Sequence, residues 1–438
     1  MRCLALITCL YLSTVAAAAA PEPPDRPLTL DDCLALARLH NPSLVIAQQG
    51  VVSAQAGVRR AASAYLPAAA LTAAHGRTGG SSFVETPAGT IAFSTSGRRR
   101  EAEVLLSQTV WQTGRRQQVG AARLSLAASR ERESQALQDL MLSVSQLYYQ
   151  ALASEELVAV AQATLEAARH HEELVRARAA VGEAAPVDLM PAAAEVAEAE
   201  YGLLQAENGA ALDRARLKKE IGLPPTYDLR LASPAEAPAA EAPPALAEAL
   251  QSAAARRPEL AALRHALAAT EESLRLTRAL ERGVIALSAQ YERGLAGPRE
   301  GTSWAAVLSA TTYLFDGGAR RAEVDSARAE LESLRAQRRE ALNAIGLEVE
   351  SALLEADTAR KSVEAATKAV ASAEAQLAAA EGKYREGVGV FVEVLDAQRT
   401  LTRARTNLVQ AQYRHQTSLV ALRKATGELA SGGDEPQP

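Results

Sequence analysis

Two long stretches of the chain repeat apolar or small residues at steps that alternate, almost throughout, between three and four. The stretches cover residues 115–180 and 319–386, and neither contains proline. The repeated positions are Leu140, Val144, Leu147, Ala151, Ser154, Val158, Ala161, Leu165 and Ala168 in the first, and Ala341, Ile345, Val349, Ala352, Ala356, Ala359, Val363, Ala366, Val370, Ala373, Leu377, Ala380 and Tyr384 in the second. This spacing is typical of a coiled-coil seam and predicts two helices of about 100 Å each. An ordinary coiled-coil rod would show the same pattern.

Two other segments, residues 65–111 and 283–315, contain glycine, serine, threonine and a modest alternation of apolar and polar residues. Each predicts two strands joined by a polar loop. The segments hold eight of the chain's 16 aromatic residues. Rings gathered at strand ends are typical of the two interfaces of a membrane barrel, although a buried soluble sheet would also collect them. The expected interface residues are Tyr65, Trp111, Tyr291, Trp304, Tyr313 and Phe315.

The two halves of the chain carry the same landmarks in the same order. These are a helical start at 28–44 and 244–260, a strand-to-helix junction at Trp111 and Phe315, and a glycine turn at Gly182 and Gly387. The offsets are 216, 204 and 205 residues, so the first half carries about twelve extra residues before its tryptophan. We interpret the chain as an internal duplication.

The duplication predicts the domain organisation. A signal peptide covers residues 1–20, a first repeat 21–222, a Pro/Ala-rich linker 223–244, a second repeat 245–428 and a disordered tail 429–438. Within the repeats we expect strand pairs at about 65–111 and 283–315, long helices at about 115–180 and 319–386, and return helices at about 188–222 and 391–428.

The composition excludes several classes of protein. The chain is 48% hydrophobic, much of it alanine, and only 4% aromatic, which is typical of closely packed long helices rather than a globular enzyme core. A net charge of −5 gives no basic footprint for nucleic acid. No Ser/His/Asp grouping, phosphate loop or nucleotide fingerprint is present, and no cofactor is expected.

The N-terminus has the charge, apolar run and small-residue end of a secretory signal; a retained anchor or lipidation at Cys9 is a less favoured alternative. After its removal Cys33 would be the only cysteine, which excludes an internal disulfide or a cysteine metal cluster. No later stretch is long and apolar enough for a transmembrane helix, so an inner-membrane transporter is excluded.

Four strands cannot close around a lumen, and lipid does not tolerate an open sheet edge. If the strands span a membrane, several copies must therefore pool them. Two copies would give eight strands with a filled interior, whereas three would give twelve with room for a channel. Secretion and strands in place of transmembrane helices favour a Gram-negative outer membrane.

The segment YREGVGVFVEVLDAQRTLTRARTNLVQAQYRHQTSLVALRKATGEL closely resembles the C-terminal half of the TolC family of outer-membrane efflux channels. The start LTLDDCLALARLHNPSL, the duplication and the junction YLFDGGARR resemble that family as well. The resemblance implies a mainly α fold with a transmembrane β-barrel portion. Its members are homotrimers with a 12-stranded barrel, four strands per chain, that continues into a long α-helical periplasmic barrel. They are not enzymes, and they dock through a periplasmic adaptor onto an inner-membrane transporter.

By this resemblance Gly182 and Gly387 lie at the periplasmic tip, where an outgoing helix turns into a returning one. Glycine suits a tight turn because it reaches backbone angles that are costly for other residues. The family's tips also bind adaptor hairpins, so the turns containing Val181 and Gly182, and Gly387 and Gly389, are candidate docking loops. Helix capping alone would explain the glycines equally well.

The resemblance places Glu393 and Asp396 where the family has acids that line the narrow periplasmic end of the tunnel. Three chains would supply six carboxylates, which would attract cations. A solvated helix face is the alternative. Tyr384 and Asp188 match residues of the closed tip, but the arginine of the best-known member is replaced by Gly389, so a salt bridge to Asp188 is unavailable from that position.

Two other classes remain open from the sequence. A periplasmic coiled-coil adaptor would share the long helices, but usually lacks a whole-chain duplication with two strand pairs. A metal-handling protein would use the histidines and acids. Adjacent helical residues such as His170 and His171 point about 100° apart, so we expect a solvated pair and no metal site. The transported substrate is not encoded in any recognisable residue pattern.

Overall fold

The computed structural model describes residues 26–87, 89–181, 186–232, 244–279, 283–296, 301–312 and 314–429. The expected signal peptide, half of the linker and most of the tail lie outside these ranges, as do Gly182 and Tyr313. The chain divides into two compact units, which are described separately. The turn unit comprises Met1–Asn41, Val144–Ala240 and Val370–Tyr413, and the sheet unit comprises the remainder.

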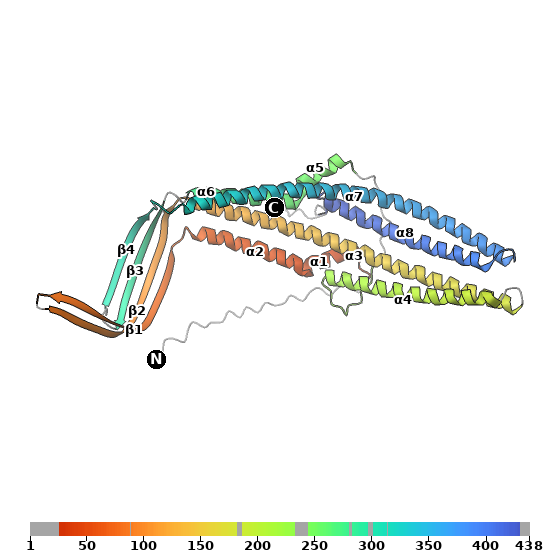
Figure 1. Ribbon diagram of the computed structural model, residues 1–438, viewed down its shortest axis with the longest axis horizontal. Coiled ribbons are helices and arrows are strands. Elements are labelled where there is room, and N and C mark those ends of the chain that lie inside the picture. Colours follow the sequence, from red (N-terminus) through yellow and green to blue (C-terminus); the bar gives the residue numbers. More distant parts are fainter. Residues whose placement is uncertain are drawn as a thin grey trace. The chain divides into compact units, whose positions relative to one another are not determined.

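The elements of the first half recur in the same order in the second half (Figure 1). The first half contains α1 (Leu30–His40), α2 (Pro42–Ser63), β1 (Ala68–Thr86), β2 (Gly89–Gln112), α3 (Arg115–Ala180), the short 3₁₀ helix η1 (Pro186–Asp188) and α4 (Leu189–Glu220). The second contains α5 (Leu246–Arg256), α6 (Pro258–Ala279), β3 (Val284–Ala296), β4 (Gly301–Thr311), α7 (Ala319–Arg385) and α8 (Phe391–Ala425). The fold is mainly helical and internally duplicated, as predicted.

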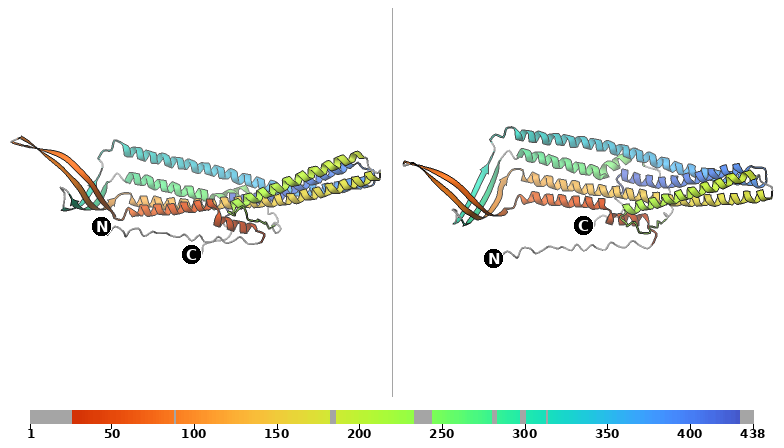
Figure 2. Two further views of the ribbon diagram at one scale, coloured as in Figure 1. Left: turned by 90° about the horizontal axis from the view of Figure 1, so that it is seen from below. Right: turned by 60° about the horizontal axis from the view of Figure 1, so that its bottom comes forward.

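The four strands of the sheet unit form one antiparallel sheet in the order β1-β2-β3-β4. The β1–β2 hairpin continues past the β3–β4 hairpin, because the residues of β2 before Arg100 pair only with β1 (Figures 1 and 2). Helices α2 and α6 both have 22 residues. The extra residues of the first half therefore lengthen its hairpin, not its helix.

The core of the sheet unit joins α5 and α6 to the first part of α7 and the end of α8. Its buried residues are Ala249, Ala253, Leu260, Ile345, Val349, Ala352, Ala356, Leu422 and Ala425. Each fully buried valine or leucine contributes about 1.5–3 kcal/mol, and the alanines allow the helices to approach closely.

Three clusters join the helices of the turn unit. Leu165 and Ala168 of α3 pack on Ala199 of α4, while Ala373 of α7 packs with residues of α8. A third cluster, which includes Val175, Ala192, Tyr384, Phe391, Val394 and Leu395, contains residues from all four helices. The α3–α4 and α7–α8 pairs therefore share one core near their turns.

The predicted seams of α3 and α7 are confirmed. Every repeated position named above is buried or half-buried, and none is exposed. Within the part of the chain that the structure describes, no helix is both long and apolar enough to span a membrane.

Candidate functional site

The turn between α7 and α8 needs both of its glycines. Gly387 has a φ of +77°, in the left-handed region that favours glycine. The amides of Val388 and Gly389 both donate to the Lys383 carbonyl at 3.1 Å. A Cβ at Gly389 would lie only 2.9 Å from the Lys383 Cβ. This turn therefore leaves no room for a side chain at position 389.

Arg178 of α3 contacts the second turn in a way the sequence did not indicate. Its guanidinium donates to the Tyr384 carbonyl at 2.6 Å and lies over the Tyr384 ring, 5.0 Å from the centroid. Tyr384 also packs against Phe391, with ring centroids 5.6 Å apart. Burial raises the pKa of Tyr384, Arg178 lowers it and Asp188 raises it. The structure thus brings Asp188 and Tyr384 into electrostatic contact and joins the two turns through Arg178.

Glu393 and Asp396 lie on one exposed face of α8, whereas Val394, Leu395 and Ala397 are buried. Neither carboxylate forms an ion pair with any residue that the structure describes. Glu393 lies in the first turn of α8, where the helix dipole stabilises a negative charge. Asp396 lies beyond that turn and has no such structural role.

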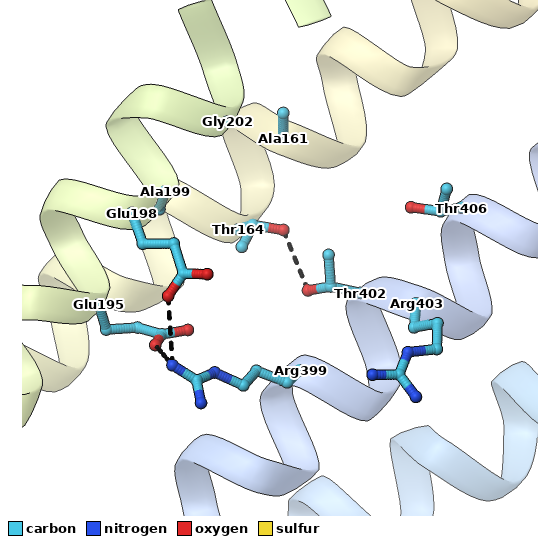
Figure 3. Close-up of a pocket in the computed structure, with 10 residues that line it drawn as sticks. All are labelled: Ala161, Thr164, Glu195, Glu198, Ala199, Gly202, Arg399, Thr402, Arg403 and Thr406. Carbon is cyan, nitrogen blue, oxygen red and sulfur yellow. Dashed lines mark hydrogen bonds and ion pairs between the residues drawn. The ribbon is translucent and has the colours of Figure 1, made fainter. Parts of the chain in front are cut away.

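Sequence reasoning missed an arginine and two acids that line a cavity of about 490 Å³ between α3, α4 and α8. Arg399 donates to Glu195 at 2.6 Å and to Glu198 at 3.3 Å, and the hydrogen bond to Glu195 raises the pKa of Arg399. Figure 3 shows one guanidinium nitrogen of Arg399 joined to both carboxylates, with the Thr164–Thr402 hydrogen bond beside them. The contact links α4 to α8. It could not be read from the sequence because Arg399 lies about 200 residues from its partners.

The expected solvated histidine pair is wrong for His171. His170 is exposed, but His171 is buried, packs edge-on against Phe391 and lies 3.5 Å from a Glu381 oxygen. His171 faces the core shared by the two helix pairs because it falls on the same side of α3 as Val175. Among the described residues, no three His, Cys, Asp or Glu side chains are arranged to hold a metal ion.

Both helical turns expose apolar side chains that the sequence analysis did not select beyond Val181. Val181, Val187 and Met190 are exposed around the first turn, and Val388 and Val390 around the second. These residues show neither the helix period nor the strand period, so the sequence pattern gave no indication that they are exposed.

The sheet has one apolar and one polar face. The register aligns Leu71, Val104, Tyr291 and Trp304 across the four strands on one face. One residue further along, it aligns Thr72, Glu103, Glu292 and Ser303 on the other. Successive residues of a strand point to opposite faces, so the apolar face suits lipid and the acidic face suits water.

The exposed aromatic residues fall at two levels of the sheet unit. Trp111 lies at the end of β2, Tyr65 follows α2 and Phe315 follows β4, all near the helices. Tyr291 and Trp304 are cross-strand partners towards the β3–β4 turn, six residues or about 20 Å along β3 from the partner of Trp111. Tyr65 also carries the Arg115 guanidinium 5.2 Å from its ring centroid.

Residues 33–223 and 249–428 match a protein family described as "OEP: Outer membrane efflux protein". The two matched ranges cover most of the chain and coincide with its two halves, so the protein belongs to this family. The TolC-family resemblance is thereby confirmed.

Protein CyaE of Bordetella pertussis is 30% identical over 431 aligned residues, and the match covers 95% of this chain and 89% of that protein. Solved structures share the fold at lower identity. A membrane protein from Pseudomonas aeruginosa is 24% identical with a TM-score of 0.77, over 91% of this chain and 93% of that one. The outer membrane protein VceC from Vibrio cholerae is 20% identical with a TM-score of 0.75, over 91% and 96%.

The protein is therefore an outer-membrane efflux channel with a periplasmic helical region, and this family is not enzymatic. Channels of this family function within tripartite systems. The adaptor alternative is excluded, because the family match covers both repeats.

Proposed function

We propose that three copies of the chain form one passive exit duct across the outer membrane. The observation that carries the proposal is the four-stranded sheet with one apolar face, whose outer strands β1 and β4 are paired on one side only within the described chain. In lipid those edges need partners. Strands from three copies would close a 12-stranded barrel wide enough for a channel, with the acidic face towards its lumen.

Two levels of aromatic residues support the membrane position. Trp111, Tyr65 and Phe315 would lie at the periplasmic interface, and Tyr291 and Trp304 at the outer one; Tyr313 belongs to the first group by sequence. The spacing of about 20 Å along the strands is of the order of the apolar band of such barrels, about 25 Å. Outer-membrane lipid is thus one partner of the protein.

We infer that Glu393 and Asp396 line the constriction of the duct. Three chains would bring six exposed carboxylates together, which would favour cations. Tyr384, Asp188 and Arg178 would hold the constriction closed, because they join the α7–α8 turn to α3 and α4 near both turns. Arg178 would provide the contact between the two turns that Gly389, which has no side chain, cannot provide.

The two turns are the proposed docking surface for a periplasmic adaptor, through which an inner-membrane transporter delivers its substrate. Val181, Gly182, Gly387 and Gly389 form the predicted loops. The exposed Val187, Met190, Val388 and Val390 would add apolar area that a helical hairpin could bury. Such a duct would serve a tripartite efflux or a type I secretion system.

Single-channel conductance in a planar bilayer tests the constriction. The proposal predicts a small, cation-selective conductance that increases or loses selectivity in the variant Glu393→Gln with Asp396→Asn. These substitutions keep side-chain shape and remove charge. A control variant, Glu166→Gln with Glu207→Gln, removes two exposed charges from α3 and α4 and should retain selectivity.

Three outcomes separate the parts of the proposal. Unchanged conductance and selectivity in the Glu393/Asp396 variant would remove the constriction assignment and keep the duct. No conductance from folded, oligomeric protein would contradict the duct itself. A molecular mass other than that of three chains would contradict the 12-stranded closure.

A further inference from the structure

The apolar face of the sheet changes character beyond Tyr291 and Trp304. Arg293 lies two residues after Tyr291 on β3, and Arg100 lies four residues before Val104 on β2. Steps of two keep side chains on one face, so both arginines lie on the face of Leu71, Val104, Tyr291 and Trp304. The face therefore changes from apolar to aromatic to basic towards the end of the sheet away from the helices.

The β1–β2 hairpin adds further basic residues to the same face. The register pairs His75 with Arg100 and Arg77 with Arg98, and all four side chains are exposed. Arg100 donates from Nε to His75 Nδ1 at 3.3 Å. We call His75, Arg77, Arg98, Arg100 and Arg293 the basic surface.

Two arginines directly opposite each other in a strand pair are destabilising. No ion pair of Arg77, Arg98 or Arg293 occurs with the residues that the structure describes. The acids nearest along the strands, Glu101, Glu103 and Glu292, fall on the other face by register. Within the described part of the strands, these like charges therefore lie together without an ion-pair partner.

The basic surface would begin at the outer membrane interface, which the aromatic residues mark, and extend outward from it. At about 3.3 Å per residue, Arg293 lies roughly 7 Å, and Arg98 roughly 20 Å, beyond the aromatic level along the strands. Arginine buries its stem on apolar surface while its guanidinium reaches polar groups. Guanidinium also pairs with phosphate through two parallel hydrogen bonds.

We propose that the basic surface binds the phosphate-bearing headgroup of an anionic lipid in the outward-facing leaflet. A phosphate between Arg77 and Arg98 would replace their repulsion with two charge-assisted contacts. The proposal rests on the proposed membrane barrel, since only then does this face meet lipid. It assigns to the longer hairpin of the first repeat a function that the shorter β3–β4 hairpin cannot provide alone.

Tryptophan quenching by brominated lipid tests the proposal directly, because Trp304 adjoins the basic surface. The full-length protein, carrying Trp111→Phe so that only Trp304 fluoresces, is reconstituted into phosphatidylcholine vesicles. The vesicles contain equal mole fractions of brominated phosphatidylglycerol or brominated phosphatidylcholine. Each arginine near a membrane surface favours an anionic lipid by roughly fivefold, so the glycerol lipid should quench several-fold more effectively.

A charge variant and a matched control test whether the preference for the anionic lipid comes from the basic surface. Arg77→Gln, Arg98→Gln, Arg100→Gln and Arg293→Gln together should reduce the quenching ratio of the two lipids to about one. Arg338→Gln with Arg339→Gln removes exposed charges from α7, far along the helix from the sheet, and should leave the ratio unchanged. The reciprocal reporter, Trp304→Phe with Trp111 retained, should show no preference.

Equal quenching by both lipids in the reporter protein would overturn the headgroup proposal while supporting a lipid-facing Trp304. A preference that persists in the fourfold variant would overturn it as well. Quenching by neither lipid would instead contradict the membrane barrel on which the proposal rests.

Discussion

The return helices α4 and α8 each carry two acidic residues three positions apart, but the surroundings of the two pairs are opposite. Glu195 and Glu198 of α4 both accept hydrogen bonds from Arg399, and Glu195 is buried. Glu393 and Asp396 of α8 are exposed and form no ion pair with the described residues. Identical spacing thus gives a structural contact in one repeat and an available charge in the other.

The two acid pairs are not counterparts in the duplication. An offset of 205 places Glu195 and Glu198 opposite Thr400 and Arg403, and Arg399 opposite Ala194. The second repeat therefore has no acids, and the first repeat no arginine, at the positions of the Arg399 contact. A cation on the partner helix, rather than the spacing of the acids, decides which pair is neutralised.

Removing Arg399 is the largest expected perturbation of this comparison. Arg399→Ala leaves the Glu195 carboxylate buried without its donor, which typically costs about 1–3 kcal/mol. Arg399 is itself half-exposed, so we expect about 2 kcal/mol or less and a lower thermal unfolding midpoint by circular dichroism. Adding Glu195→Gln should recover part of the loss. Arg403→Ala, at the same cavity but without an ion pair to any residue that the structure describes, is the control, and an equal effect of both arginines would contradict the assignment.

The next largest expected effect on stability comes from Gly387 in the α7–α8 turn. Gly387→Ala forces a Cβ into the left-handed region, at a cost of about 1–2 kcal/mol. Amide hydrogen exchange at Val388 and Gly389 should accelerate by about tenfold, because opening of the turn becomes easier. Gly346→Ala in α7 meets no atom within 4 Å and should instead stabilise the helix by about 1 kcal/mol. Slower exchange in Gly387→Ala would show that the turn does not need this backbone conformation.

The sequence predicted features that depend on neighbouring residues, and it did not predict contacts between residues far apart in the chain. The seams of α3 and α7 were predictable because the heptad period is local to each helix. The four-stranded, duplicated fold was predictable because its landmarks recur in order. The Arg399 contact and the burial of His171 were not, because each depends on a helix distant in the sequence. The twelve extra residues were counted correctly, but only the strand register places them in the β1–β2 hairpin.

The smallest expected effect on stability concerns α1 and α5, the helices that begin the two repeats. Cys33 of α1 corresponds to Ala249 of α5 at the offset of 216, and both are buried. Cys33→Ala should therefore cost about 1 kcal/mol or less, since it removes a single buried atom from a site whose counterpart already packs with alanine.

The thiol itself should be nearly inert in the native protein. Burial, followed by the charge of Asp32, raises the pKa of Cys33 to about 12. Only the thiolate reacts, so at pH 8 about one molecule in 10⁴ would be reactive, roughly a thousandfold less than for a free cysteine. A chromogenic disulfide reagent should then modify the processed chain only after denaturant is added, at one thiol per chain. Modification of the native protein at the rate of a free cysteine would mean that α1 opens readily, and that the two helical starts differ in stability as well as in sequence.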